Sequence, residues 1–178
     1  MIAKEIKRVF VHIRWPLQCY TFLGFIFGLV IAKVDFQLAV VIALFSQFLL
    51  WAGVTLFNSY YDKDDKPVGG LKNPPKITNS LLYGSLFFKI TALILALFVN
   101  GVFLFLTIFI IFASILYSHK KFRLKSNGFV ALLFNFIAGF VTFLSSSSIK
   151  ENILLEPNVI FGSISAGLFL MAVYLMMQ

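Results

Sequence analysis

The stretch that decides the fold is an apolar run from Leu38 to Phe57 that continues as Asn58-Ser-Tyr-Tyr-Asp62-Lys-Asp64-Asp65-Lys66-Pro67. The run has the roughly 20 mainly apolar residues that a helix needs to cross a bilayer. An acidic residue at the centre of a membrane helix costs roughly 2.5 to 3.5 kcal/mol. The three carboxylates are therefore expected at the membrane surface or in a polar cavity, where acidic residues are candidates for function.

Composition places the whole chain in a membrane. Hydrophobic residues make up 60% of the 178 residues, with a mean hydropathy of +0.95, whereas soluble domains contain about 45 to 50%. The net charge is +8, but most basic residues lie in short segments. They indicate membrane topology and an anion-binding rim, so we expect a lipid bilayer and no nucleic acid as partner. A single cysteine, Cys19, excludes an intramolecular disulfide.

The hydropathy pattern predicts an all-α integral membrane protein that forms a single membrane domain over residues 1–178. Six segments are long and apolar enough to be transmembrane helices. They are Leu17–Ala32, Leu38–Ser59, Leu81–Val99, Val102–Tyr117, Phe129–Ser146 and Val159–Met177.

Loop charges predict the orientation of these spans. Twelve basic residues fall in the N-terminal segment, the loop after the second span and the loop after the fourth span, against only Lys33 and Lys150 on the opposite side. Basic loops remain in the cytoplasm. The sequence therefore predicts a multi-pass protein of the cytoplasmic (inner) membrane with a cytoplasmic N-terminus.

A polar stripe follows the second span. Asn58, Asp62 and Asp65 are spaced i, i+4 and i+7, which places them on one face of a helix. Carboxylates beside a carboxamide form the oxygen set that Mg²⁺ prefers, so these three residues, with Asp64 as a second choice, are the expected metal ligands. The plainer alternative is a solvated helix end. Extended into the membrane, the same stripe includes three further residues, Gln47, Trp51 and Thr55.

Two motifs resemble one family. Asn58-x-x-x-Asp62 at the end of the second span resembles the first aspartate-rich motif of the UbiA-type intramembrane prenyltransferases. The loop Tyr117-Ser118-His-Lys-Lys121-Phe-Arg123-Leu-Lys125 resembles the basic loop after the family's fourth span. The likeness extends over nearly the whole chain in span order and loop lengths. It implies the front part of a nine-helix bundle, in which an isoprenyl group moves from a prenyl diphosphate to an aromatic or lipid-pathway acceptor.

The resemblance also implies roles for individual residues. Asp62 and Asp65 would be catalytic and would hold Mg²⁺ on the diphosphate, which basic residues would grip. The expected diphosphate-binding residues are Lys72, Lys121, Arg123 and Lys125, and the expected cavity residues are Gln47, Trp51, Thr55, Tyr117 and Asn135. Lys72 could equally be a solvated loop charge, and Asn135 could instead bond to a neighbouring helix. Lys89, within the third span, is expected to extend toward the membrane surface.

The sequence departs from the family pattern at two points. Lys66 stands where the family has a further aspartate, and the family's second aspartate-rich motif would begin where this sequence stops, at Gln178. We therefore expect a C-terminally truncated prenyltransferase domain that is catalytically silent alone. Two alternatives remain open at this point, a cation-binding transporter component and an inactive fragment.

Overall fold

Seven α-helices and one 3-10 helix form the regular structure of residues 2–63, 74–150 and 152–176, which are the residues that the computed structural model describes. The helices are α1 (Ile2–His12), α2 (Trp15–Ile31), α3 (Leu38–Asp62), α4 (Asn79–Ala96), α5 (Gly101–Ser118), η1 (Leu124–Ser126), α6 (Gly128–Ser147) and α7 (Pro157–Met176). This part of the chain contains no strand, so the all-helical fold predicted from the sequence is confirmed for it.

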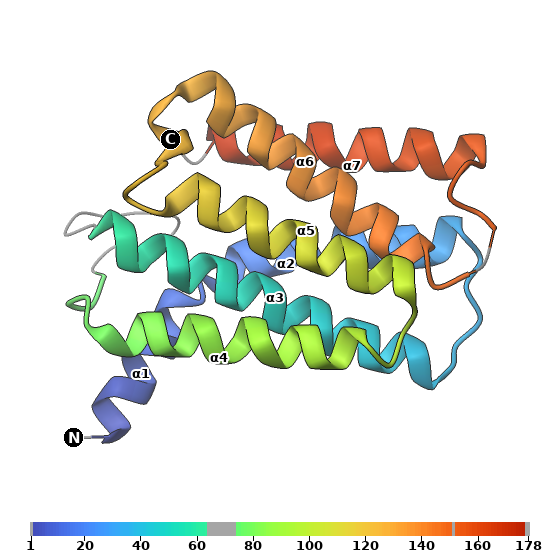
Figure 1. The fold of residues 1–178 in the computed structure, drawn as a ribbon. Coiled ribbons are helices and arrows are strands. Elements are labelled where there is room, and N and C mark those ends of the chain that lie inside the picture. The colour runs from blue at the N-terminus through green and yellow to red at the C-terminus, as the bar shows by residue number, and fades with distance from the viewer. Residues whose placement is uncertain (1, 64–73, 151, 177–178) are drawn as a thin grey trace.

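Five helices, α3 to α7, are each long and apolar enough to cross a membrane, and the bent pair of α1 and α2 makes a sixth candidate. Each predicted span coincides with one helix to within a turn. The spanning helices lie side by side in one bundle, with α2 behind α3 and α5 and with α7 behind α6 in the view of Figure 1.

The first span differs from its prediction because a separate helix precedes it. α1 and α2 meet at a bend of 53°, where Arg14 adopts a left-handed conformation with a φ of 57°. Pro16 lies in the first turn of α2. A proline there fixes its own φ and lacks a donor that the first turn does not need, so α2 begins at this point.

Helix α3 ends earlier than the polar stripe requires. Lys63 has a left-handed backbone with a φ of 52°, and its N–H donates to the carbonyl of Ser59 at 3.2 Å. A left-handed residue turns the chain off the helix axis, so α3 carries the predicted stripe as far as Asp62. Asp65 itself lies outside the described residues.

Glycines allow the helices α2, α6 and α7 to approach one another closely at the backbone. A Cβ atom on Gly139 of α6 would lie 2.2 Å from the carbonyl oxygen of Ala166 in α7. A Cβ atom on Gly28 of α2 would lie 2.6 Å from the carbonyl oxygen of Phe143 in α6. Close backbone approach of this kind is a common way to join helices within a membrane, and here it fixes α2, α6 and α7 relative to one another.

Gly139→Ala is expected to destabilise the bundle by roughly 1 to 3 kcal/mol, the usual cost of overpacking, because a backbone carbonyl cannot move aside as a side chain can. The matched control is Gly128→Ala in the same helix, where an added Cβ atom meets nothing within 4 Å. Thermal unfolding of both variants in detergent measures the difference. Equal melting temperatures would contradict the assigned α6–α7 contact.

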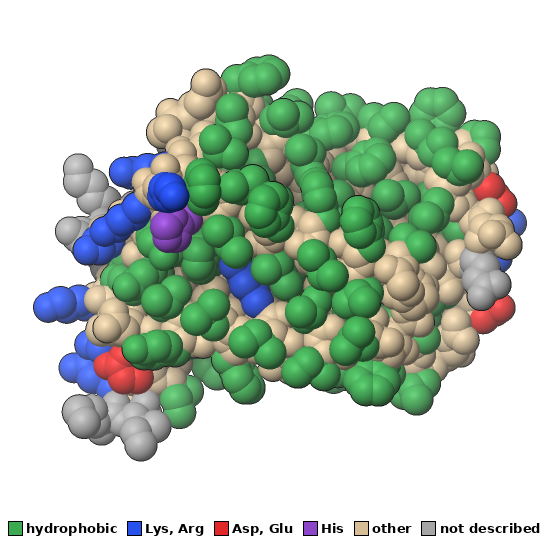
Figure 2. Space-filling view, in the orientation of Figure 1, with side chains coloured by type: hydrophobic (Ala, Val, Ile, Leu, Met, Phe, Trp, Pro, Cys, Tyr) green, Lys and Arg blue, Asp and Glu red, His purple; other side chains and the backbone are tan. Residues whose placement is uncertain are grey.

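The surface divides into an apolar belt and charged ends. Figure 2 shows hydrophobic side chains over the length of the bundle, Lys and Arg gathered at one end, and most of the visible Asp and Glu at the other. We call the end with Lys63, Lys76, Lys120 and Lys121 the basic end. The chain termini also lie toward this end (Figure 1).

Candidate functional site

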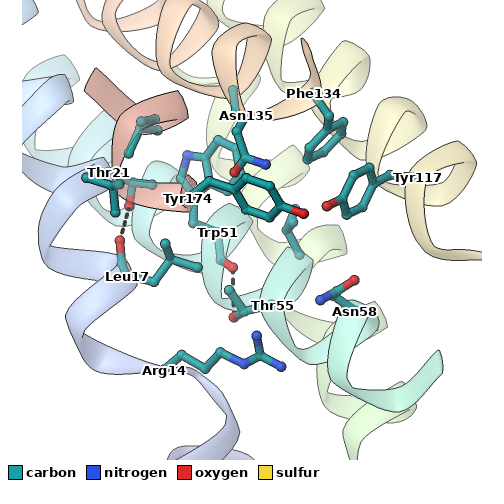
Figure 3. Close-up of a pocket in the computed structure, with 14 residues that line it drawn as sticks. Arg14, Leu17, Thr21, Trp51, Thr55, Asn58, Tyr117, Phe134, Asn135 and Tyr174 are labelled. Atoms are coloured by element: carbon teal, nitrogen blue, oxygen red, sulfur yellow. Dashed lines mark hydrogen bonds between the residues drawn. The ribbon is translucent and has the colours of Figure 1, made fainter. Parts of the chain in front are cut away.

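A cavity of about 150 Å³ lies between five helices. It is lined from α2, α3, α5, α6 and α7, so segments far apart in the sequence build it together (Figure 3). Its walls are Arg14, Leu17, Thr21, Trp51, Val54, Thr55, Asn58, Tyr117, Phe134, Asn135, Ala138, Leu170, Val173 and Tyr174. Five of the residues selected from the sequence are among them, namely Trp51, Thr55, Asn58, Tyr117 and Asn135.

The aspartate motif and the basic loop meet beside this cavity. Lys125 of η1 forms an ion pair with Asp62, and its ammonium also donates to Asn58 Oδ1 at 2.9 Å. Ser118 Oγ, at the end of α5, donates to the same oxygen at 2.9 Å. The two motifs that carry the family resemblance are therefore in direct contact through side chains.

These contacts orient the Asn58 amide. Because its oxygen accepts two hydrogen bonds, from Ser118 and Lys125, the amide nitrogen must point the other way. Figure 3 shows this nitrogen turned toward the cavity, on the side where Arg14 enters. An amide NH₂ group provides two donors, so Asn58 offers hydrogen bonds to a ligand in the cavity.

Arg14 brings a second cation to the same place. It precedes α2, is buried, and donates from Nη2 to Ser59 Oγ at 3.1 Å. Its guanidinium extends toward the cavity from the basic end, opposite the two tyrosines (Figure 3). A guanidinium presents several N–H groups in a planar fork that matches phosphate oxygens.

Aromatic side chains form the deeper walls. Tyr117 stacks on Phe134 with ring centroids 4.1 Å apart, and the hydroxyls of Tyr117 and Tyr174 point toward each other (Figure 3). Trp51 is buried, and its indole N–H finds no hydrogen-bond partner among the described residues. Since an unpaired buried donor is costly, a ligand acceptor at this wall would satisfy it.

Two predicted cavity residues have different surroundings. Gln47 does not line this cavity, because its Nε2 donates to Thr142 Oγ1 at 3.2 Å and thereby joins α3 to α6 at a deeper level. Asn135 does line the cavity, although its Nδ2 donates to the carbonyl of Ala131 in its own helix at 2.8 Å. The prediction for Gln47 is therefore corrected to a buried inter-helix contact.

The other predicted anion-binding residues separate into two groups. Lys121 and Arg123 are exposed on the loop before η1, and of the three basic residues predicted there only Lys125 forms a hydrogen bond or ion pair with Asn58 and Asp62 in the described part of the chain. Asp64, Asp65 and Lys72 lie outside the described residues.

Lys89 is buried instead of reaching the membrane surface. Its side chain is 4% exposed, its Nζ donates to Ser114 Oγ at 2.9 Å, and it lies 4.0 Å from the centroid of the Phe57 ring. α3 leaves room for it because a Cβ atom on Gly53 would meet Lys89 Cγ at 2.8 Å. A hydroxyl and an aromatic face thus replace water around the amine, so the prediction that it extends to the surface is wrong.

The electrostatics of Lys125 are set by burial and by its neighbours. Burial of the ammonium, together with the positive charge of Arg14, lowers the pKa of Lys125 to about 8. Its ion pair with Asp62 favours the charged form. The ammonium is therefore charged at neutral pH and loses its proton well below the usual pKa of a lysine.

The described oxygen ligands fit part of a magnesium site. Asn58 and Asp62 offer an amide and a carboxylate oxygen one helical turn apart, and both already face a cation, the Lys125 ammonium. Among the described residues no group of three His, Cys, Asp or Glu side chains could hold a metal. Hard oxygen donors are what Mg²⁺ requires, and it commonly uses only one or two carboxylates plus substrate phosphates.

Sequence reasoning missed nine of the fourteen lining residues, and Arg14, Phe134 and Tyr174 are the three of them that carry the most chemistry. Arg14 was counted only as a topology signal, although it lies between Ile13 and Trp15 at the start of an apolar helix. A positively charged side chain is unfavourable at a helix N-terminus, so the position of Arg14 could have indicated a role in binding. Phe134 and Tyr174 carried no signal in a chain with 23 Phe and 6 Tyr.

Comparisons of this chain with protein-family models, curated proteins and solved structures find no match. The family resemblance therefore rests on the residues of the two motifs and on the order of spans and the lengths of loops.

Proposed function

We propose that this chain forms part of an Mg²⁺-dependent intramembrane prenyltransferase of the UbiA type, with a fold that corresponds to the first helices of a nine-helix bundle. It would transfer an isoprenyl group from a prenyl diphosphate to an aromatic or lipid-pathway acceptor. In this proposal the basic end faces the cytoplasm and the chain spans the inner membrane several times.

One observation carries the proposal: donors and cations gather at the polar end of a cavity whose remaining walls are aromatic and aliphatic. Arg14, Asn58 and Tyr117 present N–H and O–H groups, and Leu170 and Val173 present apolar surface. An amphiphile with an anionic, acceptor-rich head and a hydrocarbon tail has the complementary chemistry. Prenyl diphosphates combine such an anionic head with such a hydrocarbon tail.

The polar groups in the described spans also favour an enzyme over a transport pathway. Asp62 lies at the end of α3, and polar side chains deeper in the bundle are paired within the protein. Gln47 donates to Thr142, and Ser46 Oγ donates to the carbonyl of Ala92 at 2.8 Å. A cation pathway needs polar groups along the whole depth of the bilayer.

The proposed reaction breaks the C1–O bond of the prenyl diphosphate, and the electron pair leaves with the diphosphate. The acceptor forms a new bond to C1 and releases a proton. Arg14, Lys125 and the Asn58 amide would bind the diphosphate oxygens and stabilise the charge that grows on them as the bond breaks. Trp51, Tyr117 and other aromatic faces would exclude water and stabilise positive charge at C1.

Magnesium would supply further neutralisation of the leaving group. Asn58 and Asp62 are the described residues that would hold it. Lys125 now contacts both oxygens, so in the loaded site its ammonium would move from these ligands to the diphosphate.

Incubation of the full-length protein, embedded in a membrane, with labelled prenyl diphosphates and a panel of aromatic acceptors tests the proposal, whereas residues 1–178 alone are expected to show no prenyl transfer above background. The expected result is a prenylated acceptor and free diphosphate, both dependent on Mg²⁺. Absence of product with every acceptor, together with no binding of the prenyl diphosphates, would exclude the proposed function.

Affinity for a prenyl diphosphate is expected to fall as the pH rises through about 8. Lys125 faces Asp62, Arg14 and Asn58, and its pKa of about 8 means that it is charged below this pH and neutral above it. Lys125→Arg keeps the charge at higher pH and should shift the decline upward. An unchanged profile in that variant would show that another group titrates.

A further inference from the structure

Helix α1 has a buried apolar side, a polar side that bonds to the start of α4, and an exposed apolar side. Its inner side packs on the bundle through Val9, which joins Ile13, the residue after α1, in a cluster with Leu56 and Leu81. Val9 lies where Gly84 of α4 leaves room, since a Cβ atom on that glycine would be 3.3 Å from Val9 Cγ1. These contacts attach α1 firmly to the bundle.

Polar contacts fix the level of α1 at the basic end. Glu5 Oε2 accepts hydrogen bonds from Thr78 Oγ1 and Ser80 Oγ, each at 2.8 Å, at the start of α4. His12 Nε2 lies 3.0 Å from the carbonyl oxygen of Pro75, just before that helix. Both ends of α1 are therefore held near the level at which α4 begins, and Figure 1 shows α1 leaving the side of the bundle there.

The outer side carries large apolar groups that no described residue covers. Ile6 is 54% exposed, Phe10 is 51% exposed and Trp15 is 47% exposed. The rings of Phe10 and Trp15 stack with centroids 6.4 Å apart, which makes the surface continuous with the start of α2. Lys4 and Lys7 are exposed on the same helix, whereas the charge of Arg8 is paired with Glu5.

The lengths of α1 and α2 show that α1 lies outside the hydrocarbon core of the bilayer. At 1.5 Å per residue, the 17 residues of α2 span about 26 Å and the 11 residues of α1 add about 17 Å. The hydrocarbon core is about 30 Å thick, so α2 nearly fills it and α1 lies beyond it. A helix at this level, with an apolar side and exposed lysines, has the features of a helix that lies in the membrane surface.

We propose that α1 lies in the headgroup region of the bilayer and binds anionic phospholipids, with Ile6, Phe10 and Trp15 in the lipid and Lys4 and Lys7 on the headgroup phosphates. We choose anionic phospholipid as the ligand because the exposed apolar side of α1 continues the apolar belt of the spanning helices and because this end of the protein is positively charged (Figure 2). Each lysine near an anionic surface contributes about a fivefold preference for it. Because α1 also contacts Thr78, Ser80 and Pro75, bound lipid would hold in place the segment that leads into α4.

Nitroxide labels on single cysteines test this proposal in the full chain. With Cys19 replaced by serine, cysteines replace Lys4, Ile6 and Phe10 one at a time, and the protein is reconstituted in phosphatidylcholine with or without an equal amount of phosphatidylglycerol. Labels at 6 and 10 should be more accessible to oxygen than to a water-soluble nickel chelate, and the label at 4 should show the reverse. The anionic lipid should lower nickel accessibility at 10 about twofold or more, in keeping with the contribution of the two lysines.

Charge reversal provides the matched control. Lys4→Glu with Lys7→Glu should abolish the effect of phosphatidylglycerol at position 10, whereas Lys33→Glu with Lys150→Glu, the same charge change at the other end, should leave it intact. High nickel accessibility at both 6 and 10 in anionic vesicles would overturn the proposal, as would an equal response in the two charge-reversed proteins. Spin–spin broadening between labels at low protein density would also overturn it, because it would show that a second copy covers this face.

Discussion

Asp62→Ala in the full-length protein is expected to lower Mg²⁺-dependent prenyl transfer by a factor of about a hundred or more, the usual effect of removing a group that stabilises a leaving anion. Asp62 supplies a carboxylate beside the Asn58 amide and holds Lys125 at the site. Without it, both the magnesium ligand and the position of the ammonium are lost. Turnover with a labelled prenyl diphosphate measures the effect, and Asp35→Ala, an exposed acid in the loop between α2 and α3, should retain full activity.

The experiment has to distinguish a loss of stability in Asp62→Ala from a loss of catalysis. Asp62 and Lys125 are partly buried, so removing one partner costs less than the roughly 3 to 5 kcal/mol of a fully buried pair, and Asp62→Ala alone should still melt earlier. Lys125→Met restores charge balance, and the double variant should regain stability while it remains inactive. Wild-type turnover in the stable double variant would contradict the assigned role of Asp62.

Arg14→Gln is expected to weaken prenyl diphosphate binding by a factor of roughly ten to a hundred, because a hydrogen bond to a charged group contributes about 1.5 to 3 kcal/mol. The guanidinium is buried at the cavity, and its bond to Ser59 fixes its direction. Arg14→Lys should bind with intermediate affinity, since it keeps the charge and loses the planar fork.

Arg123→Gln removes the same charge from an exposed position on the same end of the bundle. Its affinity should fall by less than that of Arg14→Gln, and by an amount that salt reduces, because exposed charges act through screened, long-range attraction. Equal losses in Arg14→Gln and Arg123→Gln at moderate salt would mean that the diphosphate binds on the surface loop and not in the cavity.

The helices could be predicted from the sequence because hydropathy and helix length are local properties. The fourth predicted span, Val102–Tyr117, is one case, since α5 extends one residue beyond it at each end. The bend between α1 and α2 was missed because α1 is amphipathic, and a search for long apolar runs passes over such a helix. The end of α3 was missed because a lysine in a left-handed conformation has no clear signal in the sequence.

The site could be predicted only in part, for a related reason. Helical spacing placed Trp51, Thr55 and Asn58 on one face, and all three line the cavity. Spacing within α3 gives no information on which other helix faces each residue, so Gln47 was assigned to the cavity although it contacts Thr142 of α6. Lys89 could not be placed for the same reason, because its burial depends on Phe57, Ser114 and Gly53 in two other helices.

Equilibrium binding of radiolabelled farnesyl diphosphate to the protein in nanodiscs of zwitterionic lipid tests the central claim most directly, because it requires no knowledge of the acceptor. We predict saturable binding that needs Mg²⁺, is displaced by inorganic diphosphate, and is lost in Asn58→Leu, which removes the amide that contacts Lys125 and faces the cavity. Absence of saturable binding in the wild-type protein, or equal binding in Asn58→Leu, would contradict the assignment of this cavity as a prenyl diphosphate site.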